Sequence, residues 1–154
     1  HLGEKQHWRK FTLWEEATRS PLIWVVPGIT KAGEICQRPV DFLSIYPTLC
    51  DLIDVPLPNH LEGNSLAALL EKPDCHWDGV ALTTHGHRNH AIRDGQFRYI
   101  RYADLSEELY DHTTDPYEFT NLANDETMIA TKRRLAAFLP KNETPPKTMS
   151  RKKK

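Results

Sequence analysis

The dipeptide Asp94-Gly95 stands between two runs of strand-forming residues and leaves this part of the chain few conformations. An Asp-Gly pair flanked by such runs is the strongest short-range signal for a β-hairpin, because these residues accept the tight turn between two antiparallel strands. Residues 91–93 precede the pair and residues 97–102 follow it. The sequence therefore predicts a hairpin centred on residues 94–95.

Two further runs flank the hairpin and predict a small antiparallel sheet over residues 78–111. Residues 80–84 and 107–110 have the length and the residue types of short strands. Successive side chains of a strand point to opposite faces of the sheet. In the central run, one face therefore carries Phe97, Tyr99 and Arg101, and the other carries Arg98, Ile100 and Tyr102.

Capping residues and apolar spacing predict four short helices. Thr12, Ser44 and Ser65 each precede a segment with helical character, and such side chains favour the position just before a helix. Pro47 would lie in the first turn of the second helix, where its missing N–H is tolerated. The predicted helices span residues 13–18, 44–53, 66–71 and 127–139.

The longest apolar run, residues 22–26, is continuous rather than alternating. Such a run is typical of a strand buried on both faces, as in a parallel sheet covered by helices. It would need parallel neighbours that the rest of this sequence does not supply. The order of the elements therefore indicates a fragment of an α/β core followed by an α+β subdomain.

Charge and cysteine content narrow the possible partners. The 154 residues contain 20 basic and 21 acidic side chains, so no overall field indicates binding to nucleic acid or to a membrane. No apolar run approaches the roughly 20 residues that span a bilayer. Cys36, Cys50 and Cys75 match no zinc-site spacing, and we interpret them as isolated thiols. A disulfide joining Cys75 to Cys36 or Cys50 is the alternative in an oxidising compartment.

Two polar segments are candidates for function. Residues 1–10 contain four charged side chains, two histidines and a tryptophan, and we interpret them as the downstream half of an active-site loop. Residues 85–90 place His85, His87, Arg88 and a third histidine between two predicted strands. This second segment would contact an anionic group or form a solvated loop. A metal site is the weaker alternative, because no cysteine or carboxylate completes a ligand set.

Four motifs in order resemble the sulfatase family of the alkaline-phosphatase-like superfamily, most closely its iduronate-2-sulfatase-like and choline-sulfatase-like bacterial members. The first motif is His1-Leu2-Gly3-Glu4 with Trp8-Arg9-Lys10, followed by the predicted helix and the apolar run. The other three are Ile45-Tyr46-Pro47-Thr48-Leu49, Leu61-Glu62-Gly63-Asn64-Ser65-Leu66, and Glu108-Leu109-Tyr110-Asp111 with Asp115-Pro116, Glu118 and Asn121-Leu122-Ala123 behind it.

The resemblance implies an α/β fold in which a fragment of an alkaline-phosphatase-like sandwich precedes a C-terminal α+β subdomain with a small antiparallel sheet and a terminal helix. Residues 1–73 would end the catalytic α/β domain, residues 74–140 would form the subdomain, and residues 141–154 would be a disordered basic tail. It also implies a periplasmic or secreted location.

The activity that the resemblance implies is hydrolysis of sulfate esters in a sulfated small molecule or carbohydrate. Neither Cys-x-Pro-x-Arg nor Ser-x-Pro-x-Arg occurs here, so the formylglycine nucleophile and the calcium ligands would lie upstream, and this chain alone would be inactive. Lys10 would be the catalytic residue that binds a sulfate oxygen, and His7, His85, His87 and Arg88 would contact substrate. Alternatives are a phosphonate or phosphate monoester hydrolase, or an inactive remnant that acts as a binding module.

Overall fold

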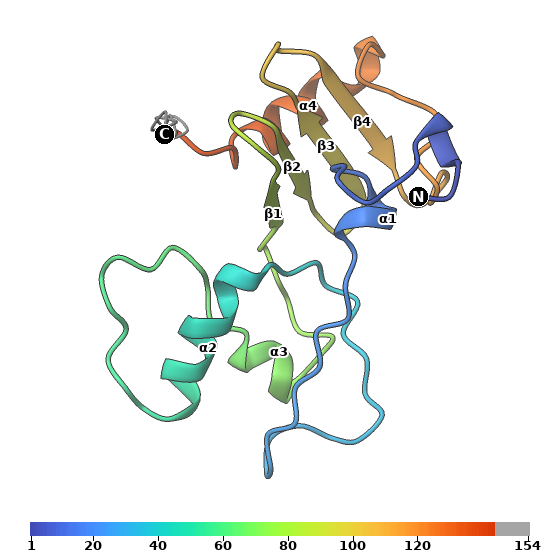
Figure 1. Ribbon diagram of the computed structural model, residues 1–154. Helices are drawn as coiled ribbons and strands as arrows, with labels where there is room; N and C mark the ends of the chain where they lie inside the picture. Colours follow the sequence, from blue (N-terminus) through green and yellow to red (C-terminus); the bar gives the residue numbers. More distant parts are fainter. Residues whose placement is uncertain (144–154) are drawn as a thin grey trace, which may run out of the picture.

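A four-stranded antiparallel sheet forms the C-terminal half of the computed structural model, which describes residues 1–143 (Figure 1). The predicted disordered tail lies almost entirely outside these described residues. The strands follow one another in the order β1-β2-β3-β4, and each pairs with the next in antiparallel fashion. The edge strands are β1, Ala81–Thr84, and β4, Glu107–Asp111. The central strands are β2, His90–Arg93, and β3, Phe97–Arg101. The predicted sheet is confirmed.

The hairpin between β2 and β3 turns at the predicted residues, but its turn is closed by a side chain. The Asp94 carboxylate accepts the backbone N–H groups of Gln96, at 2.8 Å, and of Phe97. Gly95 does not adopt a positive φ. The aspartate therefore supplies the turn through local hydrogen bonding, as short polar side chains commonly do.

Helix α4, Ile129–Ala136, covers one face of the sheet after the short helix η3, Glu126–Met128 (Figure 1). The core between helix and sheet is apolar, as alternation along the strands requires. Its buried members are Ile92, Tyr99, Leu109, Ala123, Leu135 and Leu139. The helix predicted over residues 127–139 is confirmed, with both ends shortened.

Residues that follow β4 protect its free edge. The Asn121 side chain accepts the Leu109 N–H at 3.0 Å and donates to the Glu107 carbonyl at 3.2 Å, and the Leu122 N–H donates to the Leu109 carbonyl at 2.8 Å. Unpaired edge groups would otherwise invite pairing with another strand. This explains the Asn-Leu-Ala motif as an edge-covering device.

The N-terminal segment covers the opposite face. Leu13 packs with Ala91, Ile100 and Tyr110, so the two faces predicted for the central strand are both buried. The adjoining helix α1 is Glu15–Thr18. Thr12 does not cap it, because its Oγ1 lies 2.7 Å from His1 Nε2 instead. The division at residue 73 stays a prediction, but residues 13–15 belong spatially to the sheet.

The buried guanidinium of Arg98 fastens this segment to the sheet. It donates to the Leu13 carbonyl at 3.1 Å and to the Glu15 carboxylate, and its Nε lies 2.6 Å from Glu118 Oε1. With 3% of its surface exposed, this cation requires partners on every side. Residues from both ends of the chain provide them.

Glu118 is the second member of this network and replaces the predicted cap of α1. Its Oε2 accepts the Glu15 N–H at 2.9 Å, and its Oε1 lies 2.8 Å from His112 Nε2. Burial alone would raise the pKa of Glu118, but the hydrogen bond with His112 and the charge of Arg98 hold that pKa below its ordinary value. Its backbone φ of 60° is a conformation that the surrounding contacts maintain.

Two short helices form a second part below the sheet in Figure 1: α2, Ile45–Leu52, preceded by η2, Phe42–Ser44, and α3, Ala67–Glu71. The fully buried Thr48 joins them, since its hydroxyl donates to the Ser44 carbonyl at 2.6 Å and accepts the Leu66 N–H at 2.9 Å. Ser65 accepts the Ala67 N–H as predicted, whereas the Ser44 side chain makes no cap hydrogen bond.

Gly63 allows the segment before α3 to approach η2 closely. A Cβ at this position would lie 2.1 Å from the Leu43 carbonyl oxygen. The Leu-Glu-Gly-Asn-Ser motif therefore reflects a close backbone contact at Gly63 that excludes any side chain.

Asp41 links this part to the sheet, because its carboxylate accepts N–H groups from both Leu43 and Leu82 at 3.1 Å.

The strand predicted over residues 22–26 is wrong. The segment forms no strand among the described residues, and Ile23 and Val25 are 83% and 84% exposed. An apolar run becomes a buried strand only when neighbours pair with its backbone and cover its side chains. Nothing in residues 1–143 does so.

The other predictions of the fold agree with the structure. The mixed α/β class, the four-stranded sheet and the terminal helix are confirmed.

The core predicts a large difference between two leucines. Leu109 is fully buried beneath α4, so Leu109→Ala should lower the free energy of unfolding by roughly 2–5 kcal/mol. Leu105→Ala, at a position that is 68% exposed, should change it by less than about 0.5 kcal/mol. Urea unfolding followed by circular dichroism measures both, and equal shifts of the midpoint would contradict this core.

The Glu118 network predicts sensitivity to acid. Because the pKa of Glu118 is lowered in the fold, its ionised form stabilises the protein above its unfolded pKa of about 4.3, and this stabilisation disappears as pH falls through the folded pKa. Glu118→Gln should cost roughly 3–5 kcal/mol at neutral pH and flatten the loss of stability below about pH 5. Exposed Glu62→Gln is the control, and an unchanged acid profile in Glu118→Gln would refute the assignment.

Candidate functional site

The opening loop, residues 1–10, is a tight turn held by its own backbone. Leu2 and Trp8 form an isolated antiparallel bridge around the short helix η1, Glu4–Gln6. Gly3 has a φ of 126°, and a Cβ there would lie 3.2 Å from the Trp8 ring. Glycine is therefore required at this position, and Trp8 supports the loop by packing on it although the indole is largely exposed.

Lys10 lies at the end of this loop with its side chain exposed. Within residues 1–143 its ammonium group makes no ion pair or hydrogen bond. Glu4, in the same loop, accepts the backbone N–H of Leu2 and stabilises the turn. That hydrogen bond holds the pKa of Glu4 below its ordinary value. Lys10 is thus available to an external anion, and its catalytic role stays a prediction.

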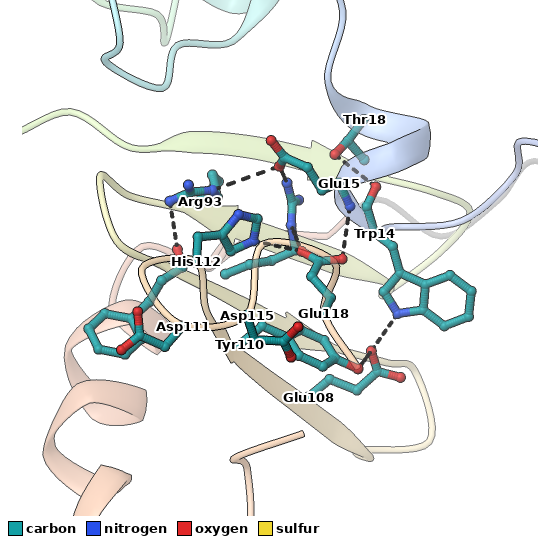
Figure 2. A network of polar contacts seen from close by, with 12 residues as sticks. Trp14, Glu15, Thr18, Arg93, Glu108, Tyr110, Asp111, His112, Asp115 and Glu118 are labelled. Atoms are coloured by element: carbon teal, nitrogen blue, oxygen red, sulfur yellow. Dashed lines mark hydrogen bonds and ion pairs between the residues drawn. The ribbon is translucent and has the colours of Figure 1, made fainter. Parts of the chain in front are cut away.

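His7 lies on the inner side of the loop among other rings. Its ring is edge-on to His1 at 5.6 Å and to Trp14 at 5.8 Å between ring centroids. Trp14 is itself fixed, because its indole N–H donates to Glu108 at 2.6 Å (Figure 2). His7 is consequently half-buried and oriented by packing. Its contact with substrate stays a prediction.

Lys5 anchors the loop in a way that the sequence did not indicate. Its ammonium lies 4.0 Å from the centre of the Tyr110 ring and 4.5 Å from that of Trp14. The nitrogen is buried without a hydrogen-bond partner among the described residues, and this burial lowers the pKa of Lys5, although the nearby charges of Glu108 and Glu118 oppose the shift. Cation–π contacts of this kind favour a desolvated ammonium.

The second candidate segment, residues 85–90, joins β1 to β2 beside the opening loop and ends on the first residue of β2. The His85 ring stacks on Phe11, with 5.7 Å between centroids and 17° between planes. Phe11 directly follows Lys10, so this stack brings the two predicted site segments together. Asn89 orders the histidine loop, since its side-chain amide donates to the carbonyls of His85, at 3.0 Å, and His87.

His87 and Arg88, the remaining predicted substrate contacts, converge on a carboxylate of the same chain. Glu143 Oε2 lies 3.3 Å from Arg88 Nε and 3.9 Å from His87 Nε2, and Glu143 Oε1 lies 3.4 Å from His90 Nε2. We did not predict Glu143 or single out His90. Glu143 lies 53 positions after His90 in the sequence, and only the fold brings them together.

The group of His and carboxylate side chains close enough to hold a metal ion, within the described part of the chain, is Glu15, His112 and Glu118. The guanidinium of Arg98 already contacts both of these carboxylates. A fixed cation therefore takes the place that a metal ion would need, and the cluster does not fit calcium. The expectation that calcium ligands lie outside this chain stays a prediction.

The cysteines are free thiols, so neither of the two considered disulfides forms. Cys36 is exposed, Cys50 is buried and Cys75 is partly buried. In residues 1–143, no helix has both the length and the apolar character to cross a membrane.

Comparisons with known proteins identify the family. The family model for N-sulphoglucosamine sulphohydrolase, C-terminal, matches residues 3–144. A protein of Formosa agariphila named "Sulfatase" is 41% identical over 140 residues, which cover 91% of this chain and 27% of that protein. The chain thus spans about a quarter of the length of this relative.

Two solved structures share the fold. The structure of BT4656 in complex with its substrate D-glucosamine-2-N,6-O-disulfate aligns with a TM-score of 0.68 and 26% identity, over 89% of this chain and 30% of that one. The phosphonate monoester hydrolase SpPMH from Silicibacter pomeroyi aligns with a TM-score of 0.69 and 26% identity, over 88% of this chain and 31% of that one.

The predicted similarity to iduronate-2-sulfatase-like or choline-sulfatase-like members in particular stays a prediction. The broader resemblance is confirmed by the match over nearly the whole chain. The protein belongs to the N-sulphoglucosamine sulphohydrolase C-terminal family, and its sequence corresponds to the C-terminal portion of a member of the sulfatase family.

Proposed function

We propose that this chain is the C-terminal part of a periplasmic or secreted sulfuric ester hydrolase that acts on a sulfated carbohydrate or small molecule. The observation that carries the proposal is the exposed ammonium of Lys10 at the end of an ordered loop, within a chain whose family is that of sulfatases. The substrate named for BT4656, a disulfated glucosamine, supports a sulfated sugar.

In this proposal Lys10 binds an oxygen of the sulfate ester. A positioned ammonium stabilises the negative charge that develops as the bond between sulfur and the leaving oxygen breaks. The packing of Trp8 and Lys5 orders the loop backbone and supports this role, since it fixes the point from which the Lys10 side chain extends. Lys10 acts as an electrostatic group and does not need to transfer a proton.

The other predicted residues contact the substrate beside Lys10. His7 lies in the same loop, and His85 adjoins it through the stack with Phe11. His87 and Arg88 follow on the same segment and carry N–H donors suited to anionic groups. These four side chains therefore orient a negatively charged substrate with respect to Lys10.

A formylglycine nucleophile and a divalent ion belong to the proposed whole enzyme, where they would supply the attacking group and hold the sulfate. Neither the sequence motif for formylglycine nor a fitting set of ion ligands occurs in the described chain. We therefore assign both to a preceding part of a longer polypeptide and propose that residues 1–154 alone are inactive.

Exposed apolar side chains support a larger folding unit. In and around α2 they recur with helical spacing, while the opposite face with Ser44 and Thr48 is buried. The exposed members of this stripe are Phe42, Tyr46, Leu49 and Ile53. A contiguous apolar stripe on a soluble protein marks a contact surface. It fits the preceding part of the polypeptide, together with the exposed Ile23 and Val25.

The alternative activity is hydrolysis of a phosphonate or phosphate monoester. The observation in its favour is the fold shared with the phosphonate monoester hydrolase of Silicibacter pomeroyi. An ammonium at Lys10 would serve either a sulfuryl or a phosphoryl oxygen, because both carry negative charge in the transition state. A binding module without activity is the remaining alternative.

The central test joins this chain to the polypeptide encoded upstream in its reading frame and matures the product with a formylglycine-generating enzyme. We expect hydrolysis of an aryl sulfate by the joined protein and none by residues 1–154. Rates on matched aryl sulfate, phosphate and phosphonate esters distinguish the candidate activities. A matured protein without activity on the sulfate would reject the arylsulfatase form of the proposal.

Lys10→Met in the joined protein should lower kcat/KM for the sulfate ester by about 100-fold or more, as for other electrostatic groups at a transition state. Lys31→Met removes a comparably exposed ammonium outside both candidate segments and should leave kcat/KM unchanged. Steady-state kinetics on the aryl sulfate measures both variants. Equal activity of Lys10→Met and the unmodified enzyme would remove Lys10 from the mechanism.

A further inference from the structure

Three nitrogen-bearing side chains surround the carboxylate of Glu143, and all of them come from the strand β2 and the loop before it. The distances from their nitrogens to the carboxylate oxygens are 3.3 Å for Arg88, 3.4 Å for His90 and 3.9 Å for His87. Convergence of an arginine and two histidines on one anion is the arrangement of an anion-binding site. Here the anion is a residue of the chain itself.

His90 is the buried member of this group. Its side chain is only 4% exposed, and its Nδ1 lies 2.8 Å from the Thr84 hydroxyl. This contact on the neighbouring strand fixes the ring and directs Nε2 toward Glu143. A buried and oriented nitrogen is already free of much of the solvent that an incoming anion would have to displace.

The rim of the site is ordered as well. Arg88 has a φ of 65°, which turns the loop at this residue. Asn89 ties both sides of the loop, because its amide donates to two loop carbonyls while its oxygen accepts the Ala103 N–H at 2.9 Å. The loop backbone that carries His87 and Arg88 is therefore ordered by contacts that do not involve Glu143.

Glu143 satisfies these donors incompletely. Its Oε2 is buried and makes no hydrogen bond of good geometry with any of residues 1–143, although Arg88 and His87 lie nearby. The Arg88 side chain is still 53% exposed. A carboxylate offers two oxygens in one plane, whereas a tetrahedral oxyanion offers acceptors in several directions to a planar guanidinium and two rings.

We propose that His87, Arg88 and His90 form a binding site for a sulfate group, and that Glu143 occupies this site when no ligand is present. Sulfate binding displaces the Glu143 carboxylate, which acts as a tethered competitor. No bond is made or broken in this exchange. The site is distinct from the Lys10 ammonium and takes one sulfate group.

The stack of Phe11 on His85 places this site beside the opening loop. Resting on the proposed function, the ligand is then a second sulfate group on the same sugar whose scissile sulfate ester is bound by Lys10. The site would select substrates that carry more than one sulfate group.

The test is titration of the 154-residue chain with sodium sulfate at constant ionic strength, followed by the NMR signals of the histidine rings. Glu143→Gln removes the tethered competitor and should tighten sulfate binding about 5-fold, since a short tether presents its group at millimolar concentration. Adding Arg88→Gln to that variant should weaken binding about 10-fold through loss of a charged hydrogen bond. Glucosamine 6-sulfate and glucosamine then distinguish a sugar sulfate from the free anion.

Two matched controls make the outcome decisive. Glu126→Gln and Arg133→Gln change an exposed carboxylate and an exposed guanidinium elsewhere and should leave sulfate binding unchanged. Equal affinity of Glu143→Gln and the unmodified chain, or of all variants with intact spectra, would overturn the proposal. This measurement needs no catalysis, so its failure is separate from failure of the joined enzyme to hydrolyse a sulfate ester.

Discussion

A single buried guanidinium, that of Arg98, holds the opening segment against the sheet, and the positions of both candidate loops depend on it. It contacts the Leu13 carbonyl and the carboxylates of Glu15 and Glu118, which come from the segments before and after the sheet. In a site of low dielectric such a charge is tolerated only when its partners are complete. The network therefore specifies one arrangement of the two ends more than it adds stability.

This arrangement has direct consequences for the surface above it. With residues 13–15 fixed, Lys5 enters between Trp14 and Tyr110, and Phe11 reaches His85. The exposed ammonium of Lys10 and the ordered histidine loop then share one side of the sheet. The site is thus assembled from long-range contacts, although each of its segments is short and local.

The part built from α2 and α3 has the opposite character. Its buried groups are few and include Thr48, Leu66 and Leu69, while most of its larger apolar side chains face outward. The chain spans about a quarter of the length of the Formosa agariphila sulfatase. Both observations agree with the proposal that this surface is covered by a preceding part of a longer polypeptide.

The sequence by itself determined the hairpin at Asp94, the alternation along β3, the Ser65 contact at α3 and the family motifs, because these features depend on neighbouring residues and on strand or helix periodicity. It did not reveal the packing of Lys5 against Trp14 and Tyr110, or the hydrogen bond by which Glu118 caps α1. It also did not reveal the contact of Glu143 with the histidine loop. Only the tertiary structure decided these, since a buried charge takes its partners from whichever distant segments the packing brings within reach.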